Sequence, residues 1–150
     1  MITIVDVTDG AGRVAAPGWL PKALPVHRQL RPTLPEGDAA YAANMQRVFS
    51  GGARMSVAAI GEGVAGVAVY RIYENTWDGL RMYVDDLVTD EARRSSGVGH
   101  ALMEHLQGIA RRAGCAWYTL DSGTHRAQAH KFYFREGMTI ASFHFKKPLK

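Results

Sequence analysis

Residues 94–99 read RSSGVG, and the two glycines stand where a helix is predicted to begin. Glycine is a poor helix former, so its use twice at a helix start needs a physical reason. The first turn of a helix carries unbonded backbone N–H groups and the positive end of the helix dipole. Glycines let the oxygens of an anion approach that backbone, and Ser95 and Ser96 add hydroxyl donors. The stretch therefore predicts an anion site, most naturally for a pyrophosphate.

Two widespread phosphate motifs do not fit this stretch. The dinucleotide-binding pattern GxGxxG requires a third glycine, but Leu102 stands three residues after Gly99. A Walker loop requires glycine followed by lysine and then serine or threonine, and the sequence lacks that triplet. On the loop alone, a flexible connection before a helix stays the simpler interpretation, so other segments must decide.

The segments around this loop alternate between strand patterns and helix patterns. Apolar runs and alternation predict strands over residues 2–7, 54–60, 64–73, 80–88, 115–122 and 139–145. Helices are predicted around residues 22–30 with Pro25 in the first turn, over 37–49 with Asp38 as N-cap, and over 97–113 and 124–137. This order predicts an α/β fold over residues 1–150, with a mixed sheet covered by helices on both faces.

The composition excludes several classes of protein. The chain has 150 residues, of which 47% are hydrophobic and 21% charged, as expected of one globular domain. No apolar run reaches the roughly 18 residues of a membrane span, and the N-terminus lacks the signal-peptide pattern. A single cysteine, Cys115, excludes an internal disulfide, so we expect a cytoplasmic protein without a membrane partner.

The charge of the chain leaves the ligand open between two kinds of polyanion. The formal net charge is +4, which suits a small polyanionic ligand as well as nucleic acid. The three tryptophans form no stacking series with basic residues, so we expect no nucleic-acid partner. His125 and His130 are five residues apart, a poor spacing for metal ligands on a helix, and we expect no metal.

A second motif, AHKFYFREGM over residues 129–138, decides between the interpretations of the loop. Together with R-x-x-G-x-G after a strand, it resembles the GNAT superfamily of acyl-CoA-dependent N-acyltransferases. The matching positions are Arg94, Gly97 and Gly99 in the loop, and Ala129, Phe132, Tyr133 and Gly137 in the helix. The resemblance runs from about residue 53 to the C-terminus, and residues 8–36 fit it loosely. Arg126 stands where the superfamily often has asparagine, and within the superfamily the C-terminal part looks most like bacterial small-amine acetyltransferases.

The resemblance implies a GNAT-like α/β fold with a mainly antiparallel sheet, splayed central strands and helices on both faces. It implies acetyl-CoA as co-substrate. The pantetheine would pair with the backbone of Leu87, Val88 and Thr89. The pyrophosphate would lie over the loop and the start of its helix, that is over Arg94, Ser95, Ser96, Gly97, Val98, Gly99 and His100.

The resemblance also assigns Tyr133 as the general acid that protonates the departing sulfur. A phenol with a pKa near 10 keeps a transferable proton at neutral pH, and a thiol has a pKa near 8.5. From the residues alone, a core tyrosine is the favoured interpretation, because Ala129, Phe132 and Tyr133 share one helix face.

The general base is sought among carboxylates near the predicted acceptor groove. Asp85 and Asp86 are successive residues of a strand, so alternation predicts that only one faces the groove. The resemblance favours Asp85 for the groove and leaves Asp86 a structural role. Glu74 and Asp78 in a hairpin turn, and Asp121 after a strand, are further carboxylates.

These observations predict an enzyme that acetylates a primary amine of a small molecule. Two alternatives stay open, namely a protein N-terminal or lysine acetyltransferase and a non-catalytic acyl-CoA-binding module. Arg71 and Arg126 leave an anionic acceptor open as well. The sequence does not fix the oligomeric state, and a homodimer is among the options.

Overall fold

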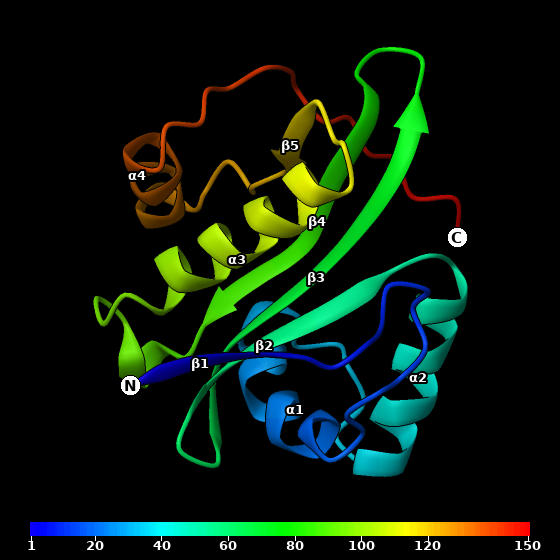
Figure 1. Cartoon of the computed structure of the whole chain (residues 1–150), viewed down its shortest axis with the longest axis vertical. Helices are drawn as coiled ribbons and strands as arrows, with labels where there is room; N and C mark the ends of the chain where they lie inside the picture. The colour runs from blue at the N-terminus through cyan, green and yellow to red at the C-terminus, as the bar shows by residue number, and fades with distance from the viewer. The chain divides into compact units, whose positions relative to one another are not determined.

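The computed structural model describes all 150 residues (Figure 1). The chain forms two compact units, Met1–Thr119 and Leu120–Lys150. The first unit holds β1 (Ile2–Asp6), α1 (Trp19–Leu30), α2 (Asp38–Ser50), β2 (Arg54–Ile60), β3 (Gly63–Asn75), β4 (Gly79–Thr89), a 3₁₀ helix (Glu91–Arg93) and α3 (Val98–Arg112). β5 (Trp117–Leu120) ends at the boundary, and the second unit contains α4 (Ala127–Arg135). None of the helices combines the length and hydropathy that a membrane crossing requires.

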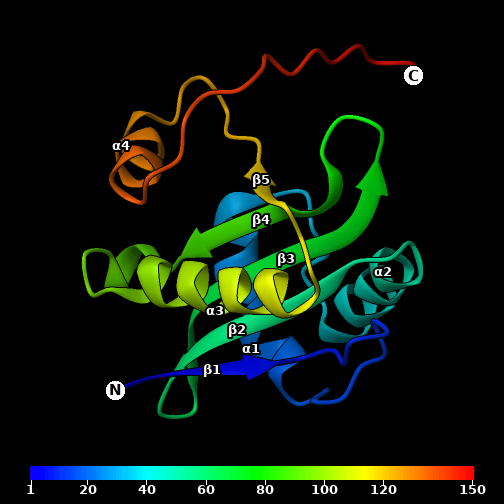
Figure 2. The ribbon, with the colours of Figure 1, turned by 45° about the horizontal axis from the view of Figure 1, so that its top comes forward.

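The strands form one sheet in the order β1-β2-β3-β4-β5 (Figure 2). The first four strands pair antiparallel with their neighbours, because short turns connect β2 to β3 and β3 to β4. At β5, the N–H of Ala116 bonds to the Leu80 carbonyl and the Thr119 hydroxyl to the Met82 carbonyl, which makes β5 parallel to β4. The predicted α/β fold with a mixed, mainly antiparallel sheet is confirmed.

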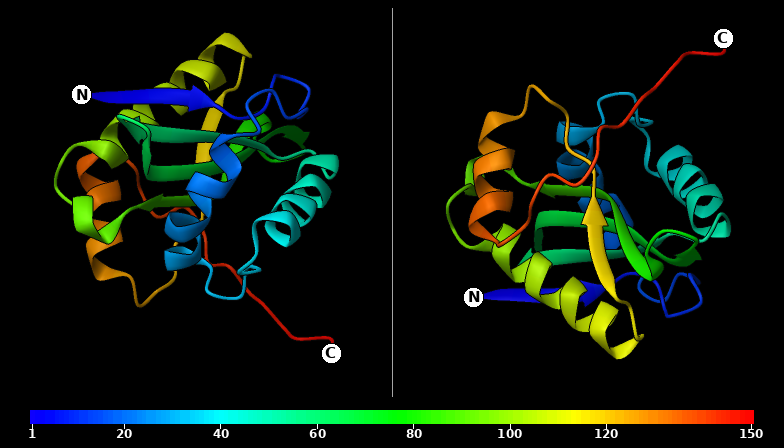
Figure 3. Two further views of the ribbon diagram at one scale, coloured as in Figure 1. Left: turned by 90° about the horizontal axis from the view of Figure 1, so that it is seen from below. Right: turned by 90° about the horizontal axis from the view of Figure 1, so that it is seen from above.

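Within the first unit, helices cover both faces of the sheet (Figure 3). α1 and α2 pack on one face, where their apolar side chains meet those of β2 and β3 in the main core; it includes Leu24, Tyr41, Met45, Phe49, Met55, Val57, Val67 and Val69. α3 lies on the other face, close to Gly66 of β3. A Cβ on Gly66 would come within 2.6 Å of a Val98 methyl and 2.9 Å of a Leu102 methyl. Gly66 therefore lets the beginning of α3 lie against the sheet.

α1 differs from its prediction in where it begins. The helix starts at Trp19, so Pro25 lies in its interior and not in its first turn. An interior proline removes one helical hydrogen bond and costs about 3 kcal/mol. The helix nevertheless buries Leu20, Ala23, Leu24, Val26 and His27 against the core. Because each large apolar side chain contributes roughly 1.5–3 kcal/mol on burial, packing outweighs the proline.

The predicted last strand, residues 139–145, is wrong, because the structure has neither helix nor strand from Met138 onward. The apolar side chains of this segment are exposed, with Ile140 at 71%, Phe143 at 82% and Phe145 at 92%. An alternating pattern forms a strand only beside a partner strand, and the second unit by itself offers none. The alternating apolar residues of segment 139–145 therefore do not form a strand.

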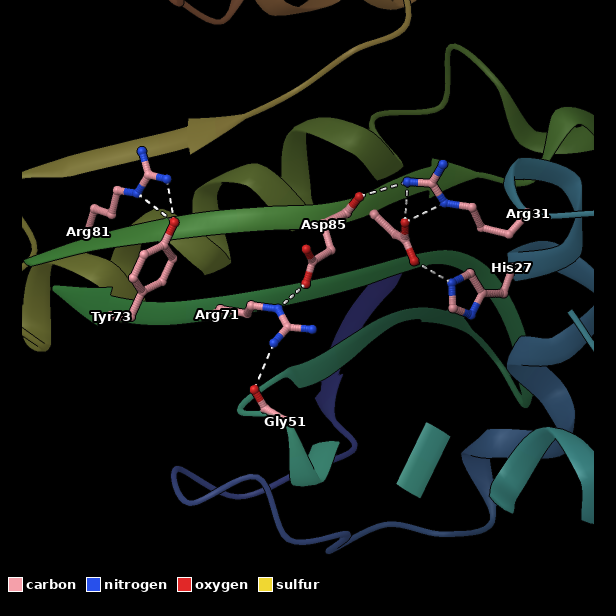
Figure 4. Close-up of polar contacts among 8 residues, drawn as sticks. His27, Arg31, Gly51, Arg71, Tyr73, Arg81 and Asp85 are labelled. Carbon is pink, nitrogen blue, oxygen red and sulfur yellow. Dashed lines mark hydrogen bonds and ion pairs between the residues drawn. The ribbon is translucent and has the colours of Figure 1, made fainter. Parts of the chain in front are cut away.

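A buried polar network joins α1 and α2 to β4. His27 is 2% exposed, and its Nδ1 lies 2.8 Å from the Tyr41 hydroxyl while its Nε2 lies 2.8 Å from a carboxylate oxygen of Asp86. Arg31 donates to the other Asp86 oxygen at 2.6 Å and to the Asp85 carbonyl at 3.0 Å (Figure 4). Burial raises the pKa of Asp86, but hydrogen bonding and electrostatic attraction from His27 and Arg31 outweigh this and lower the pKa overall.

The same burial, together with the charge of Asp86, raises the pKa of Tyr41, so its phenol stays protonated. A protonated phenol is both a donor and an acceptor, so Tyr41 satisfies Nδ1 of His27 while Nε2 bonds Asp86. Each polar group of this network then has a partner, as buried polar groups require.

We predict that Asp86→Asn destabilises the protein by about 2 kcal/mol at pH 7, because His27 and Arg31 lose the carboxylate that they both contact. This cost is lower than that of breaking a fully buried ion pair, because the side chain of Arg31 is partly exposed. The folded-state pKa of Asp86 is lowered, so its stabilisation is present above the unfolded pKa near 4 and is lost as the pH falls through the folded pKa. Urea unfolding of wild type and variant should therefore differ at pH 6–8 and converge in acid. Glu62→Gln in the exposed β2–β3 turn is the matched control, and equal midpoints at pH 7 for wild type and Asp86→Asn would contradict the assignment.

Candidate functional site

The RSSGVG stretch forms an exposed connection between β4 and α3. Residues 91–97 are exposed, and Val98, the first residue of α3, is buried and anchors the helix. Gly97 adopts φ +85°, a conformation that favours glycine and turns the chain into the helix. No side chain caps the start of α3, and its first turn contains no acidic residue. The helix start is therefore open and electropositive, which is the geometry that an anion site needs.

Side chains outside the motif fix the beginning of this connection. The amide of Gln29 in α1 donates to the Asp90 carboxylate at 3.0 Å and accepts from the Glu91 backbone at 2.9 Å. The hydrogen bond from Gln29 is also the main reason that the pKa of Asp90 is lowered. Gln29 was not identified from the sequence, because a polar residue on a helix gives no sign of what it bonds. The Ser96 hydroxyl donates to the Arg93 carbonyl and so closes the turn.

The end of β4 that precedes the connection is the part predicted to hold the pantetheine. Leu87, Val88 and Thr89 pair with β3 along one edge of the strand. β5 contacts β4 at Leu80 and Met82, near the beginning of that strand. The second backbone edge of β4 at Leu87–Thr89 is the edge that the predicted pantetheine would use.

A β-bulge in β4 overturns the prediction that Asp85 and Asp86 lie on opposite faces of the sheet. Val69 of β3 pairs with Asp86, but Tyr70 pairs with Val84, so Asp85 is an extra residue without a register partner. A bulge breaks the alternation of side chains and redirects them locally. Asp86 contacts α1, and Asp85 contacts Arg71, which in turn bonds to the carbonyl of Gly51 after α2. Both carboxylates therefore reach groups on the side of the sheet where α1 and α2 pack.

The Arg71–Asp85 pair lies at a hollow in the surface of the first unit. The hollow has a volume of about 280 Å³ and is lined by Gly51, Gly52, Arg71, Ile72 and Tyr73. Arg71 donates from Nε to Asp85 at 2.7 Å and from Nη1 to the Gly51 carbonyl at 2.8 Å (Figure 4). The two side chains are 33% and 30% exposed, so a ligand in solution can reach them. Arg71 was noted in the sequence, but its partner was not.

The hairpin beyond the hollow carries a second fixed cation. Arg81 bonds to the Tyr73 hydroxyl and to Asp78, the latter at 2.9 Å, and lies over the rings of Tyr73 and Tyr83. Asp78 is 12% exposed at its side chain and already paired, so it is neither a solvated turn residue nor a free carboxylate for an acceptor.

In the second unit, α4 carries the motif residue Tyr133. The helix begins at Ala127 with Arg126 as its N-cap, later than the predicted cap at Thr124, and Gly137 with φ +86° follows its end. Tyr133 is 9% exposed, and burial raises the pKa of its phenol while Arg126 partly opposes this rise. Asp121 forms an ion pair with His144 at 3.2 Å within this unit. Tyr133 belongs to the second unit and Asp85 to the first.

No group of three or more histidine, cysteine, aspartate or glutamate side chains is placed so that it could hold a metal ion. Cys115 is partly buried, and burial raises the pKa of its thiol, which makes it a poor nucleophile.

Known proteins resemble the chain in sequence and in fold. An uncharacterized N-acetyltransferase, YhdJ, of Bacillus subtilis is 40% identical over 72 residues, which are 47% of this chain and 51% of the relative. The aminoalkylphosphonate N-acetyltransferase of Salmonella typhimurium is 30% identical over 80 residues, 53% of this chain and 50% of the relative. An acetyltransferase of Trypanosoma brucei has a crystal structure that matches with a TM-score of 0.79 at 20% identity, covering 99% of this chain and 100% of that one.

The curated matches are partial, since the chain spans about half the length of the relatives it matches. The fold match at 20% identity extends over nearly the whole chain and shows the fold alone. The model of the acetyltransferase (GNAT) family matches residues 23–138, which is well over half of the chain and includes the loop, β4 and the α4 motif. The chain therefore belongs to the acetyltransferase (GNAT) family.

Proposed function

We propose that residues 1–150 act as one N-acetyltransferase domain that transfers an acetyl group from acetyl-CoA to a primary amine of a small molecule. The observation that carries the proposal is the open, glycine-led start of α3 after the exposed connection from β4, in a chain of the acetyltransferase family. The proposed compartment is the cytoplasm.

In this proposal the pyrophosphate of acetyl-CoA lies over Arg94–His100 and accepts hydrogen bonds from the backbone at the start of α3. Gln29 supports the site by holding Asp90 and Glu91, and so the beginning of the connection. The pantetheine would pair with the backbone of Leu87–Thr89, which places the thioester next to the bulge at Asp85.

The proposed reaction is a direct attack within a ternary complex, without a covalent enzyme intermediate. The amine nitrogen forms a bond to the thioester carbon, the carbon–sulfur bond breaks, and the thiolate takes a proton from Tyr133. A backbone N–H of β4 would stabilise the oxyanion. Holding both reactants in one site supplies much of the rate by itself.

The amine must lose a proton before or during the attack. An alkylammonium with a pKa near 10 is about one part in a thousand neutral at pH 7, so deprotonation costs roughly 4 kcal/mol unless the site assists. Asp86 is engaged at both oxygens by His27 and Arg31, whereas the described bonds of Asp85 engage one oxygen. Asp85 is therefore the proposed acceptor of this proton, directly or through water.

Two observations support a small acceptor. The hollow beside Asp85 has a volume of about 280 Å³, which suits a small molecule. The Salmonella typhimurium relative is named for its action on aminoalkylphosphonates. A screen of CoA thiol release against panels of primary amines tests the proposed activity directly, and peptides with free N-termini test the protein acetyltransferase alternative.

We predict that Gly99→Val raises the dissociation constant of acetyl-CoA by about tenfold or more, because a branched side chain would occupy the space of the phosphates. Calorimetric titration with acetyl-CoA measures this change. Gly108→Val, in the middle of the same helix, is the matched control and should leave the affinity unchanged. A folded Gly99→Val variant with wild-type affinity would remove the pyrophosphate from this loop.

We predict that Tyr133→Phe lowers kcat by a factor on the order of 10² to 10⁴ and leaves acetyl-CoA affinity nearly unchanged, because only the transferable proton is lost. Single-turnover thiol release with the best amine of the screen measures the chemical step. Tyr70→Phe removes the hydroxyl of another buried tyrosine and serves as the control. Near wild-type single-turnover rates in Tyr133→Phe would leave Tyr133 a packing residue.

We predict that Asp85→Asn depresses kcat most below pH 8 and recovers part of it at high pH, where more of the amine is already neutral. Profiles of kcat from pH 6 to 9.5 test this for a single amine. Asp86→Asn should lower stability with less effect on the shape of the profile. If Asp85→Asn keeps the wild-type shape throughout, Asp85 is not the base.

A further inference from the structure

We propose that the acceptor amine carries an oxyanion group a short distance from its nitrogen, and that Arg71 binds this group while Asp85 binds the ammonium. The inference rests on the proposed function, since it places the acceptor beside Asp85. It adds the chemical class of the acceptor and assigns Arg71 as the residue that selects it.

Arg71 is oriented by two hydrogen bonds and keeps donors for a ligand. Its Nε bonds to Asp85 and its Nη1 to the Gly51 carbonyl, so the N–H groups of Nη2 are left for a further acceptor. The side chain is 33% exposed and lines the hollow. A planar guanidinium held in this way matches the paired oxygens of a carboxylate or a phosphonate.

The charges at the hollow favour an acceptor that brings no net charge. Among its lining residues, Gly51, Gly52, Arg71, Ile72 and Tyr73, the charged one is the cation Arg71. Asp85 balances Arg71, while Asp86 is balanced by Arg31 and Asp78 by Arg81. A simple alkylammonium or a polyamine would add positive charge that these three paired carboxylates do not offset, and the exposed Glu74, next to Tyr73 in sequence, lies outside the lining of the hollow. A zwitterion adds none, and its ammonium and oxyanion complete an alternating set of four charges with Asp85 and Arg71.

The dimensions of the hollow agree with a short acceptor. Its volume of about 280 Å³ lies at the lower end of the roughly 300–1,000 Å³ of small-molecule sites. Gly51 and Gly52 form one wall, and a glycine wall leaves the backbone open to the ligand. The two charged ends of the acceptor must reach Arg71 and Asp85, which are themselves in hydrogen-bond contact at 2.7 Å, so few atoms can separate its ends.

The test compares amines that carry an acid group with amines that do not. CoA release is measured with propylamine, spermidine, 3-aminopropanoate and 2-aminoethylphosphonate at saturating acetyl-CoA. We expect kcat/KM for at least one of the two acid-bearing amines to exceed that for propylamine by about tenfold or more, the effect of one added charged hydrogen bond. The stronger of the two shows whether the site prefers a carboxylate or a phosphonate.

The variant Arg71→Gln should lower the ratio of kcat/KM between the acid-bearing amine and propylamine by about tenfold, through KM for the acid-bearing amine. Arg71→Lys keeps the charge without the planar fork and should give an intermediate ratio, which also serves if Arg71→Gln folds poorly. Arg111→Gln is the matched control, because Arg111 is exposed on α3 and bonds to Gln107 of its own helix. It should leave the ratio unchanged.

The outcomes separate this inference from the proposed function. Acetylation of propylamine or spermidine at least as efficient as that of both acid-bearing amines would overturn the inference and leave the transferase activity standing. Absence of transfer to every amine would count against the proposed function. In that case calorimetric titration of the CoA-bound protein decides the inference: binding of 2-aminoethylphosphonate or 3-aminopropanoate, weakened by Arg71→Gln, supports it, and no binding at millimolar concentration overturns it.

Discussion

The bulge at Asp85 is the constraint on which the arrangement of the site depends. In a regular strand, one of two successive carboxylates would lie on the face of the sheet that α3 covers. A buried carboxylate there would lack a partner and would cost several kcal/mol. The extra residue lets both carboxylates meet polar partners instead, Arg31 and the imidazole of His27 for Asp86, and Arg71 for Asp85.

The last turns of α1 connect this bulge to the loop before α3. His27 and Arg31 are four residues apart and hold the same carboxylate, and Arg31 also bonds the backbone of the bulge. Gln29 lies between them in sequence and holds the chain just after β4, at Asp90 and Glu91. One helix end therefore fixes both the strand segment and the connection that are proposed to bind acetyl-CoA. Residues 8–36, whose fit to the superfamily is loose in sequence, include this support.

Periodicity was enough to predict most elements. It failed where contacts with residues distant in sequence determine the structure. β2, β3, β4 and α3 follow their predicted bounds closely, because alternation or helical spacing continues through each of them. α1 was placed too late because Pro25 is unfavourable locally, whereas burial of the helix face determines the outcome. The strand predicted over residues 139–145 failed for the opposite reason, since its alternation has no partner strand in the second unit. The bulge was missed although β4 carries a sign of it, since the spacing of the apolar residues Met82, Val84 and Leu87 changes from two to three across Asp85 and Asp86.

The candidate site shows the same division between local and long-range information. The glycines of the loop and the motif around Tyr133 are local patterns, and the sequence identified both. The roles of Asp85 and Asp86 depend on which distant side chains contact them. Two identical neighbouring residues therefore have different hydrogen-bond partners. Asp86 has both oxygens occupied and a lowered pKa, so accepting a proton near neutral pH would break its bonds to His27 and Arg31. Asp85 is partly exposed and bonded through one oxygen to an arginine that is itself open to ligands. The fold thus uses Asp86 to hold the strand, whereas Asp85, bonded to Arg71 of the hollow, is the proposed proton acceptor.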